Sequence, residues 1–206
     1  MNRIILIIVI ITGVVTYLSW QKKDLFAKLL FSPYSIFKNN EYHRIITHGF
    51  VHANWPHVII NMLVFWSFGS VLLVYFGIFW DSFGDMLFII FYLLAIVFSS
   101  FFSLFKHKDN PSYSAVGASG AVSAVVFATI FFDPWNKVYF FGILPIPGII
   151  FGAIYLIYSY RMTKKGGDNI GHDAHFWGAV FGFVFPVILK PELMQHFINR
   201  ITTIPL

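Results

Sequence analysis

Apolar residues gather along this chain in long runs, which polar or mixed segments separate. A run of 20 residues without a charge, such as residues 86–105, is long enough to cross a membrane as a helix. The runs predict six helices, at about residues 4–20, 57–77, 86–105, 116–132, 138–160 and 175–189. The first run shows no small-residue cleavage site near its end, so we expect a retained span and not a signal peptide. The pattern predicts an all-α membrane protein with one domain over residues 1–206.

The composition agrees with a membrane protein and restricts its chemistry. Hydrophobic residues make up 58% of the 206 residues, charged residues only 11%, and the mean hydropathy is +0.74. The net charge of +5 is scattered over short loops without a basic stripe, so we expect no nucleic-acid partner. The chain has no cysteine, which excludes disulfides, thiolate nucleophiles and cysteine-ligated metals. Any chemistry therefore rests on Ser, His and Asn.

The fourth and sixth runs are short, and each carries a reactive side chain at its beginning. Residues 116–132 stop at Asp133-Pro134, and at 1.5 Å per residue they measure about 25 Å against about 30 Å of hydrocarbon. Ser119, in the first turn, should then lie below the membrane surface, where protein or a water-filled cavity must shield it. His175 begins the sixth run. Because such groups are costly at membrane depth, they indicate a functional site.

A histidine series leads into the second run. It follows residues 21–55, which mix Lys with Leu and Phe as a segment in the membrane interface does. The spacing is H-x3-H-x4-H-x3-N, formed by His48, His52, His57 and Asn61. His57 and Asn61 are four residues apart on one helix, so their side chains project from the same face. Two such donors aimed at one point can stabilise an oxyanion where water is scarce.

His175 can act as a general base for Ser119 if the two helices that carry them touch. Small residues permit a close approach of helices in a membrane. Glycines mark the faces on which we expect this contact: Gly117, Gly120, Gly178 and Gly182. The sequence therefore suggests that a base and a nucleophile meet between the fourth and sixth helices.

Each motif also has a structural interpretation. The tetrapeptide around Ser119 can be small-residue packing, and Ser123 and His172 can be packing and loop residues. The histidine series can be a set of interfacial polar groups bonded to the backbone, or a zinc site. Zinc sites usually include a carboxylate or thiolate, and none lies among these residues, so we expect no metal and no cofactor. A transporter with a histidine proton relay would need carboxylates inside a span, and none is evident.

Together and in this order, the motifs resemble the rhomboid intramembrane serine proteases. The motifs are the histidine series, Gly117-Ala118-Ser119-Gly120 and Ala174-His175-x2-Gly178-x3-Gly182, and the resemblance extends from Arg44 to Leu189. It implies a bundle of six transmembrane helices in which a short interior fourth helix bears the nucleophile. It also implies a Ser-His dyad that hydrolyses peptide bonds in or near transmembrane helices of single-span or polytopic membrane proteins.

The resemblance assigns a role to each candidate residue. Ser119 is the nucleophile and His175 the base, and His57, Asn61 and the Ser119 amide hold the oxyanion. The supporting residues are His52, Gly117, Gly120, Gly178 and Gly182. Arg44 stands at the arginine of the family's Trp-Arg pair, which orders the first loop.

Three positions depart from the family pattern. His43 replaces the tryptophan of the Trp-Arg pair, and Leu73 replaces a glutamate that is common after the second span. Ser123 stands where many relatives have an aromatic residue that packs against the catalytic histidine. None of the three removes a catalytic group. The alternative within this fold is a pseudoprotease that binds transmembrane helices without cleavage, and the intact Ser119 and His175 argue against it.

The expected orientation follows the resemblance and conflicts with the loop charges. Bacterial members place both termini in the cytoplasm and the active site towards the outside, so we expect a bacterial inner membrane protein in contact with lipid. Four cationic residues then lie inside: Arg3, Lys137, Lys190 and Arg200. Ten lie outside: Lys22, Lys23, Lys28, Lys38, Arg44, Lys106, Lys108, Arg161, Lys164 and Lys165. This distribution is the reverse of the positive-inside rule.

Overall fold

A computed structural model describes residues 3–140, 142–167 and 170–203 of the chain, which are mostly helical. The helices are α1 (Arg3–Gln21), α2 (Lys23–Leu29), α3 (Pro33–Asn39), α4 (Arg44–Thr47), α5 (Trp55–Trp80), α6 (Gly84–Lys106), α7 (Ser119–Phe132), α8 (Gly148–Lys165), α9 (His172–Leu189) and α10 (Leu193–Thr202). Short 3-10 turns, η1 (His48–Phe50) and η2 (Asp81–Phe83), precede α5 and α6, and strands β1 (Lys137–Phe140) and β2 (Leu144–Pro147) form a hairpin.

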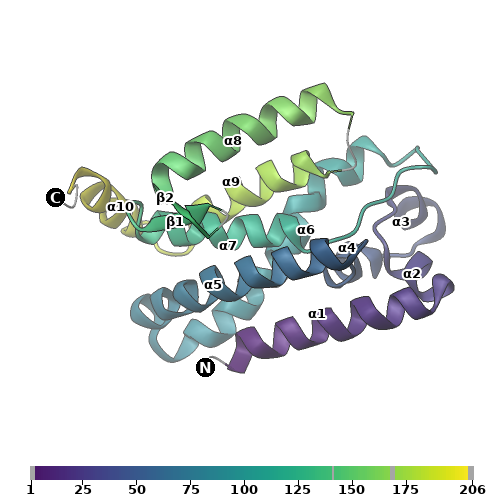
Figure 1. Cartoon of the computed structure of the whole chain (residues 1–206), viewed down its shortest axis with the longest axis horizontal. Coiled ribbons are helices and arrows are strands. Elements are labelled where there is room, and N and C mark those ends of the chain that lie inside the picture. Colours follow the sequence, from purple (N-terminus) through teal and green to yellow (C-terminus); the bar gives the residue numbers. More distant parts are fainter. Residues whose placement is uncertain (1–2, 141, 168–169, 204–206) are drawn as a thin grey trace.

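Helix α7 is the centre of the bundle. Thirteen of its 14 residues are buried, because α5, α6, α8 and α9 pack around it (Figure 1). A helix that is apolar on every side is stable only when neighbours cover all of its faces. Figure 1 also shows that both termini lie at one end of the bundle. The α2–α4 segment and the connections that lead into α7 and α9 gather at the opposite end.

Three helical segments are long and apolar enough to cross a membrane, within the described part of the chain. They are Arg3–Gln21, Trp55–Lys106 and His172–Leu189, and the second of them contains both α5 and α6. Helix α7 is apolar but shorter. Large apolar side chains are exposed along these helices, as on a surface that faces lipid.

The expected helix 138–160 is wrong in its first part. Residues 137–140 and 144–147 pair as an antiparallel hairpin, in which Val138 pairs with Ile146 and Lys137 with Pro147, and α8 begins only at Gly148. Pro145 and Pro147 lack backbone N–H groups and would clash inside a helix, so they fit the short hairpin instead. The other five predicted helices agree with the structure to within a few residues at each end.

Helix α10 was not expected from the sequence. It packs against α7 and α9 through Phe197, whose ring stacks on Phe131 with centroids 5.4 Å apart. Arg200 donates a 2.7 Å hydrogen bond to Asp133, the residue at which α7 ends. These contacts close the end of the bundle that holds the termini.

Candidate active site

Ser119 is the first residue of α7, and the backbone before it is held in an unusual conformation. Gly117 has φ +119°, a value that side chains with a Cβ rarely adopt. A Cβ at Gly117 would also lie 2.6 Å from Cε1 and 2.7 Å from Nε2 of His57. The ring of His57 therefore lies directly on the loop that delivers Ser119. Glycine is required here for two independent reasons.

Residues 48–52 hold the same loop through hydrogen bonds. The amide of Gly117 donates to the carbonyl of His48 at 3.0 Å, and the amide of Ala118 donates to Nε2 of His52 at 3.3 Å. Because Nε2 of His52 accepts, the ring proton lies on Nδ1, which donates to the hydroxyl of Thr16 at 3.2 Å. Thr16 in turn donates to the carbonyl of Phe50 at 3.1 Å.

His52 is fully buried and lies between η1 and α5, outside the helices long enough to span a membrane. Burial, with the neighbouring His57 as a smaller cause, lowers the pKa of His52 to about 3. A neutral ring agrees with the acceptor role of Nε2. Thr16 was not expected at the site from the sequence, although buried polar residues recur on this face of α1 at Thr12, Thr16 and Ser19.

The start of α5 fixes His57. Asn54 is the N-cap residue, and its side chain accepts a hydrogen bond from the His57 amide at 3.0 Å. The His57 ring packs edge-on against His52, with centroids 4.9 Å apart. Asn61 is buried one turn deeper, and its amide group donates to the carbonyl of His57 at 3.0 Å. The structure thus brings His52 and His57 to the loop before Ser119, and it places Asn61 one turn further along α5.

Helix α9, which carries His175 in its first turn, is in direct backbone contact with α7. A Cβ at Gly178 would lie 2.0 Å from the carbonyl oxygen of Gly120, and one at Gly182 would lie 2.0 Å from that of Ala124. A Cβ at Gly120 would lie 3.1 Å from the carbonyl oxygen of Ala174. Ala174 directly precedes His175 and Gly120 directly follows Ser119, so the two reactive residues occupy neighbouring first turns.

Polar contacts fix the beginning of α9 to α6. Asp173 accepts a short hydrogen bond from Ser103 and a second one, 2.9 Å long, from the amide of Ala174. Tyr113, in the connection between α6 and α7, donates to Ser103 at 3.3 Å. No sequence motif marks this network, because its members lie on three separate segments.

Ser123 is more than a packing residue, because it has polar partners on two helices. Its hydroxyl donates to the carbonyl of Ser119 at 2.8 Å and lies 2.6 Å from the hydroxyl of Tyr155 on α8.

The first loop is ordered although the family's tryptophan is absent. Arg44 is buried and donates to the carbonyls of Ala27 and Leu30, and a ring nitrogen of His43 lies 3.0 Å from the carbonyl of Lys28.

The described residues hold no group of three or more His, Asp or Glu side chains placed to bind a metal ion.

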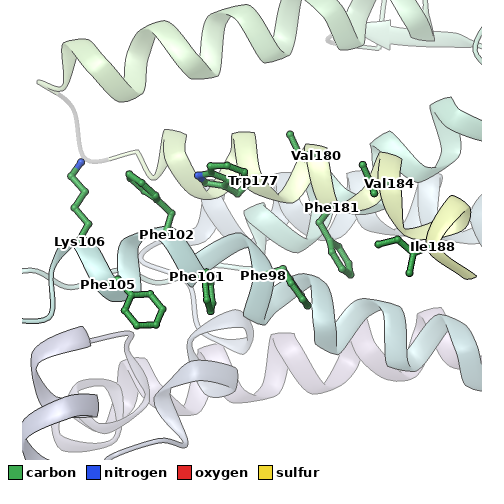
Figure 2. Close-up of a pocket in the computed structure, with 10 residues that line it drawn as sticks. All are labelled: Phe98, Phe101, Phe102, Phe105, Lys106, Trp177, Val180, Phe181, Val184 and Ile188. Carbon is green, nitrogen blue, oxygen red and sulfur yellow. The ribbon is translucent and has the colours of Figure 1, made fainter.

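A groove of about 790 Å³ lies between α6 and α9 on the outer surface of the bundle (Figure 2). Its lining is apolar apart from Lys106, and includes Phe98, Phe102, Trp177 and Phe181. None of the candidate catalytic residues lines it, so this groove is separate from the site around Ser119.

Comparisons with known proteins agree with the motifs. A family model described as the rhomboid domain matches residues 39–192. RHOMBOID-like protein 12, mitochondrial, of Arabidopsis thaliana is 27% identical over 158 residues, which are 69% of this chain and 45% of that protein. Rhomboid protein 1, mitochondrial, of Saccharomyces cerevisiae is 32% identical over 149 residues, 68% of this chain and 40% of that protein.

Presenilin-associated rhomboid-like protein A, mitochondrial, of Danio rerio is 29% identical over 144 residues, 67% of this chain and 35% of that protein. The chain thus spans less than half the length of these three relatives. All three are named as mitochondrial, so they give no support to the expectation of a bacterial inner membrane.

Proposed function

This chain belongs to the rhomboid family, and we propose that it is an intramembrane serine endopeptidase that cleaves membrane proteins in or near their transmembrane helices. The family and the apolar helices make it an integral membrane protein. The observation that carries the proposal is the convergence around one loop. Ser119 begins a buried helix, the His57 ring covers Gly117, and the first turn of α9 with His175 lies against Gly120.

In the proposed mechanism, the hydroxyl of Ser119 attacks the scissile carbonyl while His175 accepts its proton. The proton then passes from His175 to the leaving amine, and water hydrolyses the acyl-enzyme. The negative charge that develops on the carbonyl oxygen is stabilised by His57, Asn61 and the Ser119 amide. Ser119 opens α7, so its amide is one of the first four in the helix and has no acceptor within it. The positive end of the helix dipole favours the same charge.

The supporting residues would act through geometry. His52 holds the Ala118 amide, and Gly117 makes room for the ring of His57. Gly120, Gly178 and Gly182 let α7 and α9 meet at backbone distance, which the dyad needs because a base must come within about 2.6–3.2 Å of the hydroxyl that it activates. No step requires a metal or a cofactor.

The membrane arrangement is part of the proposal. Six crossings are formed by α1, α5, α6, α7, α8 and α9, with α7 as the short interior helix and the site open to the extracytoplasmic side. The substrates are single-span or polytopic membrane proteins that reach the site from the bilayer. This orientation follows the family resemblance, and the excess of cationic residues on the outer side opposes it.

Labelling with a fluorophosphonate tests the proposal. The reagent should attach to Ser119 in the wild-type protein, and Ser119→Ala should abolish labelling because the nucleophile is lost. His175→Ala should slow labelling sharply. Asn199→Ala, on the distant helix α10, should label as the wild type does. Undiminished labelling of Ser119→Ala would exclude Ser119 as the nucleophile, and a wild type that is never labelled would favour a pseudoprotease.

A further inference from the structure

Tyr155 of α8 contacts both helices of the proposed dyad. Its ring lies at 29° to the ring of His175, with centroids 6.3 Å apart, and its hydroxyl lies 2.6 Å from Oγ of Ser123. Phe127 and Phe151 pack against the same ring, with centroids 5.6 Å and 5.8 Å away. The aromatic ring is thus confined on several sides and can hold a neighbouring imidazole in place.

The direction of the hydrogen bonds at Ser123 follows from proton counting. A serine hydroxyl has one proton, and that of Ser123 is donated to the carbonyl of Ser119 at 2.8 Å. The hydroxyl of Tyr155 must therefore donate to Ser123. Two hydrogen bonds in series connect α8 to the backbone of the residue that bears the nucleophile, and hydrogen bonds in such chains strengthen one another.

Apart from this hydrogen bond, α8 packs against α7 through apolar side chains such as Phe151 and Leu156. Gly152, one turn before Tyr155, leaves ordinary van der Waals distances to Phe127 of α7, since an added Cβ would lie 3.4 Å from that ring. Within the described part of the chain, the Tyr155–Ser123 pair is the one hydrogen bond that joins a side chain of α8 to a side chain of α7. The position of Tyr155 relative to the dyad is therefore set by this one polar contact and by the rings around it.

We propose that Tyr155 is a positioning residue for the dyad, which holds the imidazole of His175 with its ring and the Ser119 turn with its hydroxyl. The inference rests on the proposed serine protease function and adds a residue from α8 to it. Ser123 of α7 has no ring, so the ring that steadies the base comes from α8.

The test compares kcat, KM and the rate of fluorophosphonate labelling in Tyr155→Leu, Tyr155→Phe and the wild type. Tyr155→Leu removes the ring, and a misplacement of about 1 Å can cost roughly 10²-fold in rate, so kcat and the labelling rate should both fall by about that factor while KM stays nearly constant. Tyr155→Phe keeps the ring and loses one hydrogen bond, so its loss should be limited to about 10-fold.

The matched control is Tyr160→Leu. Tyr160 is also on α8, and its ring packs against Phe176, the residue that follows His175, with centroids 5.9 Å apart. Its substitution removes the same kind of aromatic contact between α8 and α9, but at Phe176 instead of His175. Tyr160→Leu should retain wild-type kcat. If the loss of a ring on α8 acts only through the fold, kcat should fall equally in Tyr155→Leu and Tyr160→Leu. That result would overturn the positioning role.

The outcomes separate this inference from the proposed function. If the wild type is labelled at Ser119 and Tyr155→Leu matches it in kcat and labelling rate, the role of Tyr155 is wrong and the protease function stands. If the wild type is inert, both fail. Should Tyr155→Leu not accumulate in the membrane, Tyr155→Met, which keeps an extended apolar side chain but no ring, is measured and judged by the same criteria.

Discussion

His57 connects the histidine series with the loop before the nucleophile. The N-cap Asn54 binds its amide, and its ring lies against Gly117 and His52. Contacts to the backbone amide of His57 and contacts to its ring therefore both fix its position. In the proposed mechanism this rigidity matters, because donors that are already in place when charge develops need no reorganisation.

Replacing either oxyanion donor should affect the chemical step. Asn61→Ala and His57→Ala should each lower kcat by about 10²–10³-fold, the usual scale for the loss of one donor, while fluorophosphonate still reaches Ser119. Steady-state cleavage of a membrane-protein substrate provides the measurement, with Asn199→Ala on the exposed face of α10 as control. Equal kcat in the wild type and in the His57/Asn61 double variant would assign both residues a structural role only.

At the residue scale, the sequence revealed the groups that form compact motifs. Ser119, His175 and the histidine series have short, fixed spacings. Thr16 and Tyr155 were missed because the partner of each lies far away in the chain: 36 positions separate Thr16 from His52, and 32 separate Tyr155 from Ser123. Only the packing of helices brings such pairs together.

At the scale of elements, the contact between α7 and α9 depends on the absence of two side chains. Carbonyl oxygens of Gly120 and Ala124 occupy the space in which Cβ atoms of Gly178 and Gly182 would stand. Backbone atoms cannot move aside as the end of a flexible side chain can. A methyl group at either glycine must therefore displace one helix from the other.

Gly178→Ala and Gly182→Ala should therefore reduce kcat strongly. A shift of about 1 Å between α7 and α9 can cost roughly 10²-fold in rate, and the thermal midpoint should fall as well. Gly152→Ala is the matched control, because a Cβ there meets only ordinary van der Waals contacts with Phe127 and Ile130. Wild-type kcat in both α9 variants, measured in detergent and in lipid, would show that the dyad does not depend on this contact.

The sequence predicted well the helices that the long apolar runs form, because a lipid environment demands continuous helices. The prediction failed at residues 137–140 and 144–147, which pair as a hairpin because Pro145 and Pro147 stop a helix. It also missed α10, whose apolar residues recur at helical spacing over only ten positions. Such a short amphipathic pattern becomes stable only against the surfaces of α7 and α9.

For the whole molecule, one end of the bundle holds the candidate chemistry. The first turns of α5, α7 and α9 meet there, while α10 and the termini lie at the other end (Figure 1). The helix α7 that carries Ser119 is surrounded by protein, and in the proposed membrane arrangement this would shield a polar site from lipid. This architecture suits cleavage of a substrate inside or next to the bilayer.

Proteolysis in a defined bilayer tests the central claim most directly. The purified protein is reconstituted in liposomes with a panel of single-span substrates, and the products are identified by mass spectrometry. The wild type should cut at least one substrate in or beside its transmembrane helix, and Ser119→Ala and His175→Ala should cut none. Binding of these substrates without cleavage by the wild type, or wild-type cleavage rates in Ser119→Ala, would contradict the assignment of this chain as a Ser-His intramembrane protease.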